Sequence, residues 1–111
     1  MKRDALYLRH ILEAIQKVET YTAAGREAFM AGSHWQDATI RQLEIIGEAT
    51  KQLSRELRAQ CPDVPWRRMA GLRDVLIHEY FGVDLAAVWQ LTLTEIPQLR
   101  KRVEIILKTV E

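Results

Sequence analysis

Apolar residues recur at three- and four-residue steps along most of the chain, which is the spacing of helices that bury one face. The first such stretch has Asp4 as its expected N-cap and places apolar residues at Leu8, Ile11, Leu12, Ile15 and Val18. No segment shows the strict alternation of a half-buried strand. The pattern predicts an all-helical fold, whose first helix weakens at Gly25 and is followed by a further helical turn over residues 26–30.

A second long helix is predicted over residues 33–57, ending before Pro62. Ser33 followed by Gln36 indicates a capping box, because each of these side chains can satisfy a free backbone N–H of the first turn. Gly47 lies within the apolar face of this helix, where the missing side chain would let another helix approach closely.

A third helix is predicted from a cap at Asp63 or Val64, with Pro65 near the first helical position, to about residue 80. Gly82 is its expected end.

Two further helical segments follow. Asp84 is expected to cap the first, which carries Leu85, Val88, Trp89 and Leu91. Pro97 then requires a break or a new start, with Thr94 as the cap of a last helix that carries Leu99, Val103, Ile106 and Val110. We therefore expect residues 1–111 to form one domain, a four- to five-helix up-and-down bundle.

Length and composition add exclusions. The 111 residues are enough for one domain, and no apolar run approaches the roughly 20 residues of a membrane span. The first residues do not resemble a signal peptide, and the single Cys61 argues against a disulfide or zinc framework. We expect a cytoplasmic protein without a metal, a cofactor or a membrane partner. The net charge of +1 excludes nucleic-acid binding through bulk charge, so any RNA contact requires a local arrangement of Arg and Lys.

Arg73 occupies an unexpected place in the predicted third helix. Trp66, Met69 and Tyr80 are among the apolar residues that lie within about 60° of it around a regular helix. Burying an unpaired guanidinium is costly, so this side should face a wet cleft, an acidic partner or another subunit.

His78 lies about 140° around the same helix from Arg73, so the two side chains do not share a face if the helix is regular. Three arrangements bring them together: the helix tightens near its end, both side chains reach the edge of one groove, or the site is shared with a second copy. Asp74 precedes His78 by four residues, a spacing that lets its carboxylate contact and orient the imidazole. A structural ion pair for Arg73 and a helix-dipole role for His78 are the plainer readings.

The sequence around these residues resembles one family over essentially the whole chain. This family, the HepT-like HEPN toxins, has an Arg-x-x-x-x-His-x-Tyr signature. The signature is matched here by Arg73-Asp74-Val75-Leu76-Ile77-His78-Glu79-Tyr80. Residues 65–72 and 81–84 are similar to the usual flanks of that motif, residues 43–49 to the second helix, and residues 88–99 to the C-terminal part.

The resemblance implies a metal-independent endoribonuclease that is the toxin of a toxin–antitoxin pair, acting as a homodimer with a composite site. His78 suits the base that takes the ribose 2′-OH proton, and the fork of Arg73 suits the phosphate. Asp74 would orient His78, while Arg67 and Arg68 could hold flanking phosphates. Tyr80 would accept AMP from a partner nucleotidyltransferase (MNT-type) antitoxin, although a half-buried aromatic is its plain alternative.

Two rival functions remain open at this point. One is a non-catalytic HEPN module that binds nucleotide or RNA, or docks to a nucleotidyltransferase. The other is a helical interaction protein in which Arg73 forms a structural ion pair. The intact pair of Arg73 and His78 favours the enzyme, because a binding module has no need to keep both.

Overall fold

The computed structural model describes residues 2–72 and 85–111, and every regular element within these ranges is a helix. The predicted all-helical class is therefore confirmed for this part of the chain. The elements are α1 (Lys2–Thr22), α2 (Arg26–Ala31), α3 (Ser33–Gln52), α4 (Arg55–Gln60), α5 (Trp66–Ala70), α7 (Leu85–Leu93) and α8 (Glu95–Val110). None of them combines the length and the apolar character that a helix needs to cross a membrane.

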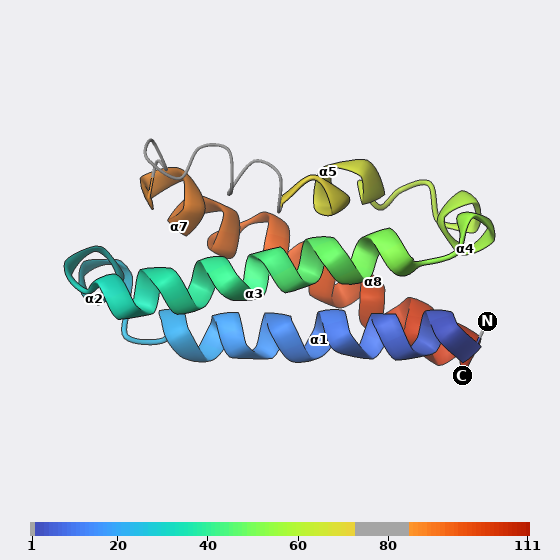
Figure 1. Cartoon of the computed structure of the whole chain (residues 1–111), viewed down its shortest axis with the longest axis horizontal. Coiled ribbons are helices and arrows are strands. Elements are labelled where there is room, and N and C mark those ends of the chain that lie inside the picture. The colour runs from blue at the N-terminus through green and yellow to red at the C-terminus, as the bar shows by residue number, and fades with distance from the viewer. Residues whose placement is uncertain (1, 73–84) are drawn as a thin grey trace.

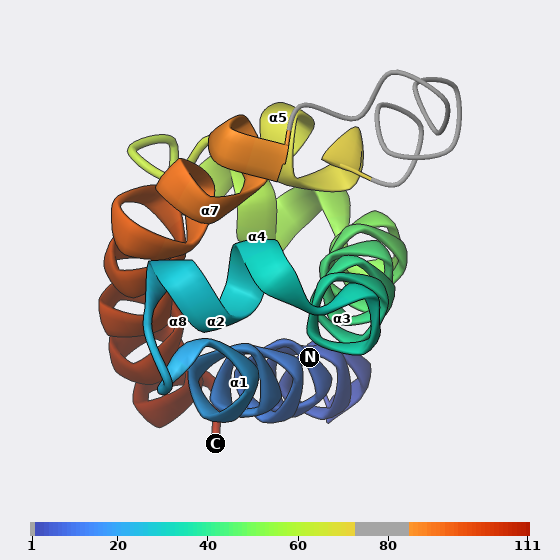
Figure 2. The same cartoon turned by 90° about the vertical axis from the view of Figure 1, so that its left-hand side faces the viewer.

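Three long helices and two short ones surround the interior. Figure 1 shows α1 and α3 side by side and antiparallel, with α8 behind them and both termini at the same end of the molecule. In the end-on view of Figure 2, α1, α3 and α8 form three sides, and α5 and α7 cover the fourth. The short helices that border residues 73–84 therefore lie together on one side.

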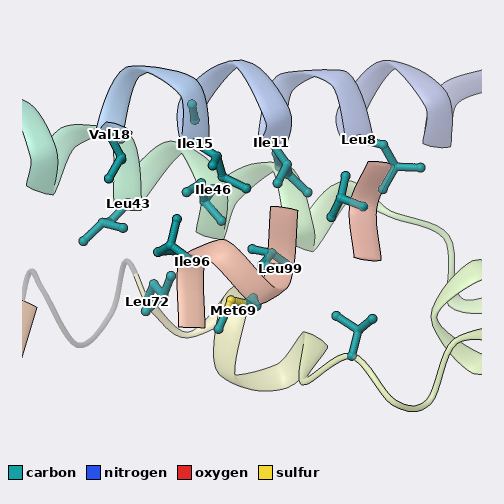
Figure 3. Close-up of a cluster of buried hydrophobic side chains, with 14 of the residues drawn as sticks. Leu8, Ile11, Ile15, Val18, Leu43, Ile46, Met69, Leu72, Ile96 and Leu99 are labelled. Carbon is teal, nitrogen blue, oxygen red and sulfur yellow. The ribbon is translucent and has the colours of Figure 1, made fainter. Parts of the chain in front are cut away.

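The interior is filled from all of these helices. Leu8, Ile11, Ile15 and Val18 of α1 are buried, as the spacing of the first stretch predicts, whereas Leu12 is only partly buried. Figure 3 shows them facing side chains of the other long helices and of the α5 region: Leu43, Ile46, Met69, Leu72, Ile96 and Leu99. Burial of each large apolar side chain contributes about 1.5–3 kcal/mol to stability.

The predicted helix over residues 33–57 is interrupted. The backbone is extended at Leu53 and Ser54, so α3 ends at Gln52 and α4 starts at Arg55. Ser54 is the N-cap of α4, and its Oγ accepts a hydrogen bond from the Leu57 N–H at 3.1 Å. The break turns the chain while leaving both Leu53 and Leu57 buried.

Asp4 has a different role from the one that the sequence predicts. It is not the N-cap of α1, because that helix already includes Lys2. The residue is 3% exposed, and its carboxylate accepts hydrogen bonds from the N–H and the hydroxyl of Ser54, both at 2.7 Å. Asp4 thus holds the α3–α4 corner against the start of α1.

Replacing Asp4 with alanine is expected to lower the free energy of unfolding by about 2 kcal/mol, since it removes two charge-assisted hydrogen bonds and leaves two part-buried donors of Ser54 unpaired. Asp37→Ala is the matched control, because Asp37 is an exposed aspartate within α3. Urea denaturation followed by circular dichroism at one fixed protein concentration measures both values. Equal losses in the two variants would contradict the role assigned to Asp4.

The predicted capping box at Ser33 and Gln36 is also wrong. The cap residue of α3 is Gly32, and Gln36 points back to the preceding helix. Its Nε2 donates to the carbonyl oxygens of Phe29 and Met30, at 3.0 and 3.1 Å. The amide therefore satisfies carbonyls at the end of α2, a use that becomes available only because α2 and α3 meet at a sharp corner.

The turn between α1 and α2 forms at Gly25, whose φ of 96° lies in the left-handed region that glycine adopts without strain. The Gly25 N–H donates to the Thr22 carbonyl at 3.0 Å, which closes α1 and redirects the chain into α2. The predicted weakening at Gly25 and the short helical turn after it are both confirmed.

The last two helices follow the sequence pattern closely. Val88 and Trp89 of α7 are buried, and so are Leu99, Val103 and Ile106 of α8. The three other predicted apolar positions, Leu85, Leu91 and Val110, are partly buried.

The caps of these helices follow the prediction less closely. Thr94 is the cap residue of α8, as predicted, but its hydroxyl donates to the Gln90 carbonyl at 3.0 Å instead of capping the new helix. Pro97 falls in the first turn, where its missing N–H removes no intrahelical bond. Asp84, the predicted cap of α7, lies outside the described residues.

Candidate active site

The predicted catalytic segment is bordered by two well-packed helices. Arg73, Asp74, His78 and Tyr80 all fall within residues 73–84, outside the described residues, as does the predicted helix end at Gly82. The structure describes the chain up to Leu72 and again from Leu85. What it establishes about the site is therefore how the protein holds the two ends of this segment.

The N-terminal side of the segment is α5. Its cap residue is Pro65, one position after Val64 and two after Asp63, the two predicted alternatives. The Trp66 N–H donates to the Val64 carbonyl at 2.8 Å before the helix begins. The Trp66 indole N–H donates to the Cys61 carbonyl at 2.9 Å, which fixes the ring at the start of the helix. The bounds of α5 end at Ala70, ten residues before the predicted end of the third helix.

The side chains of α5 show where one face of the predicted helix points. Trp66 and Met69, which the sequence analysis places on the side of Arg73, are buried in the chain's own core. Leu72, the residue directly before Arg73, is also buried. The chain that enters the motif is thus anchored by apolar packing up to its last described residue.

The C-terminal side of the segment is α7. Trp89 packs against Phe29 of α2 with ring centroids 5.3 Å apart. Thr92 is buried, and its hydroxyl donates to the Trp89 carbonyl at 2.6 Å. The helices on both sides of residues 73–84 are therefore held in place by core aromatics.

Arg67 and Arg68, the predicted phosphate contacts, are both exposed on α5. The Arg68 Nε lies 2.8 Å from Glu95 Oε1, at the start of α8. Arg68 and Glu95 also line a shallow hollow together with Ala87, Gln90, Leu91 and Thr94. Sequence reasoning missed Glu95, and its only signal was an acidic residue in the first turn of the last helix, a common feature of helices.

A second ion pair joins the chain before α5 to α8. The Arg102 guanidinium donates to both carboxylate oxygens of Asp63, at 2.5 and 3.0 Å. This hydrogen bonding lowers the pKa of the Asp63 carboxyl and raises the pKa of Arg102. Both groups stay charged at neutral pH, so α8 is tied to the α5 region by two acid–base pairs.

No group of three His, Cys, Asp or Glu side chains gathers closely enough to hold a metal ion within residues 2–72 and 85–111.

Within residues 2–72 and 85–111 the fold is all-helical, and the motif falls in the sequence between α5 and α7. The ribonuclease HepT-like family matches this chain over residues 11–106, which include the whole motif segment. The chain belongs to that family.

Individual relatives agree with the family match. "Putative RNase TTE0752" of Caldanaerobacter subterraneus subsp. tengcongensis is 44% identical over 109 residues, covering 97% of both chains. "Probable ribonuclease HepT" of Thermococcus cleftensis is 43% identical over 99 residues, covering 88% of this chain and 90% of its own.

A longer relative matches equally well. "Gamma-glutamylcyclotransferase and putative RNase MJ0434" of Methanocaldococcus jannaschii is 44% identical over 105 residues, which are 93% of this chain. The match spans about half of that relative, 47% of its length. No solved structure is significantly similar to this chain.

Proposed function

We propose that this protein is a metal-independent endoribonuclease, the toxin of a HEPN/MNT-type toxin–antitoxin pair. The observation that carries the proposal is the family match over residues 11–106, within which Arg73, His78 and Tyr80 stand at the motif spacing. The ribonuclease names of the relatives support RNA as the substrate.

The proposed reaction is an internal phosphoryl transfer. His78 takes the proton of a ribose 2′-OH, whose oxygen attacks the adjacent phosphorus. The bond from phosphorus to the 5′-oxygen breaks, and that oxygen receives a proton from an acid. The products are a 2′,3′-cyclic phosphate and a 5′-hydroxyl. Arg73 stabilises the charge that builds on the phosphate oxygens, and Asp74 orients His78.

The test is cleavage of a structured RNA by the purified protein in EDTA, alongside His78→Ala. Cleavage by the wild type and loss of cleavage in the variant would support the proposal. RNA binding without cleavage would favour a non-catalytic module instead. Because EDTA removes divalent metal ions, cleavage in this assay also tests whether the reaction is independent of metal.

A homodimer is part of this proposal, since cleavage uses both a base and an acid whereas one chain supplies one motif histidine, His78. Two copies facing each other would bring two such residues to one cleft. We expect light scattering at micromolar concentration, with no other protein present, to give twice the mass of the chain. A monomer under these conditions would contradict the shared site.

The proposed partner is an MNT-type nucleotidyltransferase antitoxin, and the proposed location is the cytoplasm, where RNA and ATP are both present. Tyr80 is the proposed acceptor of AMP. In the proposed complex with RNA, Arg67 and Arg68 contact phosphates on either side of the cut. This proposed phosphate contact is supported by the exposure of both side chains on α5, directly before the motif segment.

A further inference from the structure

The ion pair between Arg68 and Glu95 joins two side chains that differ in their exposure to solvent. The Arg68 side chain is 61% exposed, whereas that of Glu95 is 33% exposed. Glu95 stands in the first turn of α8, and its Oε2 is buried without a hydrogen-bond partner among the described residues. Glu95 is therefore the fixed partner, and Arg68 is the partner that can swing away.

The pair borders the shallow hollow between α5, α7 and the start of α8. Since α5 precedes residues 73–84 and α7 follows them, this hollow lies between the two anchors of the motif segment. Besides Arg68, its lining offers the exposed side-chain amide of Gln90 as a hydrogen-bond donor. A guanidinium and an amide at the edge of an open hollow suit a phosphate group of a nucleic-acid backbone.

Glu95 presents a carboxylate to Arg68 where such a phosphate would bind. We propose that Glu95 occupies Arg68 in the free protein, and that an RNA phosphate displaces it by drawing the guanidinium into the hollow. This inference rests on the proposed ribonuclease function and adds a residue that regulates substrate binding. Glu95 is a positioning residue here, because it acts on RNA only through Arg68.

The exchange is energetically feasible because the Arg68 side of the pair is largely exposed to solvent, where ion pairs are weak. A pair of this kind contributes little to stability, so a phosphate that offers the guanidinium equal or better hydrogen bonds can replace the carboxylate. After the exchange, the freed carboxylate of Glu95 remains near the phosphate and opposes its binding. Neutralising Glu95 should therefore strengthen RNA binding, whereas breaking a purely structural tie should weaken it.

The experiment compares Glu95→Gln with Glu104→Gln. Glu104 is a matched control, since it also lies on α8 and accepts from an arginine Nε, that of Arg100, at 2.7 Å. The probe is a fluorescent single-stranded RNA with 2′-O-methyl riboses, which cannot be cleaved by 2′-OH attack. We expect Glu95→Gln to tighten binding on the order of two- to fivefold, and Glu104→Gln to leave it unchanged.

Arg68→Ala supplies the second half of the test. It should weaken binding and reduce the slope of log Kd against log salt by about 0.7, the value for one phosphate contact on a single strand. In the Arg68→Ala background, Glu95→Gln should give no further tightening, because the two residues act as one unit. With cleavable RNA, Glu95→Gln should lower KM and leave kcat unchanged.

Several results would overturn the inference. These are weaker or equal binding by Glu95→Gln, equal tightening by Glu104→Gln, or a gain that persists without Arg68. Glu95→Ala should tighten binding in the same way, and it replaces Glu95→Gln if thermal unfolding shows that the glutamine variant does not fold. Wild-type protein that neither binds nor cleaves RNA would overturn the proposed function as well, whereas wild-type cleavage without the Glu95 effect would overturn this inference alone.

Discussion

Alanine at either Arg73 or His78 is expected to lower RNA cleavage by about 10³-fold or more, into the background of the assay. In the proposed mechanism, losing His78 removes the base that takes the 2′-OH proton, and losing Arg73 removes the charge that stabilises the phosphate in the transition state. Because the two groups serve one transition state, the double variant should be scarcely slower than either single variant. Single-turnover cleavage of a labelled RNA in EDTA measures all three rates.

Two surface residues of the same types provide the controls. His34 at the start of α3 and Arg26 on α2 are both exposed, so His34→Ala and Arg26→Ala should cleave at the wild-type rate. Circular dichroism should show the same helical signal for every variant. Cleavage that persists in purified His78→Ala protein would disprove the mechanism, and a loss in His34→Ala would show that the assay reports folding instead of chemistry.

Silencing through Tyr80 is expected to have an effect of similar size. In the proposed modification by ATP and a nucleotidyltransferase, the Tyr80 phenol oxygen attacks the α-phosphorus, pyrophosphate leaves, and the phenol proton passes to a base. The added AMP brings a negative phosphodiester and a bulky adenosine to the segment that carries Arg73. Cleavage should fall to background as the adduct forms, which mass spectrometry follows together with the RNA assay.

Tyr80→Phe should keep most of the cleavage, since no proton transfer is assigned to the phenol, but it should escape silencing. Tyr21→Phe is the matched control, because Tyr21 is a partly exposed tyrosine on α1, far along the chain from the motif. It should be modified and silenced like the wild type. An adduct on another residue, or covalent silencing of the Tyr80→Phe protein, would contradict the assignment.

Some residues of the candidate site can be recognised from the local sequence pattern, whereas others are brought in only by long-range contacts. Arg73, His78 and Tyr80 can be picked out from sequence because a motif is a matter of residue type and spacing, and the family match covers it. The partner of Arg68 cannot be found that way. Glu95 follows it by 27 positions along the chain, and only the packing of α5 against the start of α8 brings the carboxylate within 2.8 Å.

The amino-acid sequence by itself determined the helical class and most of the core, because burial of one helix face leaves a periodic record that needs no knowledge of neighbours. Leu8, Ile46 and Val103, from three different helices, occupy positions of this periodic pattern and are all buried. Side chains near helix ends follow no such period. Ser, Asp and Gln can satisfy any nearby backbone group, so their choice depends on what the fold brings close.

The tertiary structure decides which groups these side chains bind. Asp4 caps nothing in its own helix and instead binds Ser54, 50 residues away, while Gln36 serves the end of α2. The break at Leu53 has the same origin, since a straight helix through residues 33–57 would lose the Ser54 cap and the Asp4 contacts together. Local propensity alone cannot decide between one long helix and two joined at a corner, because the contacts that favour the corner come from Asp4 at the start of α1.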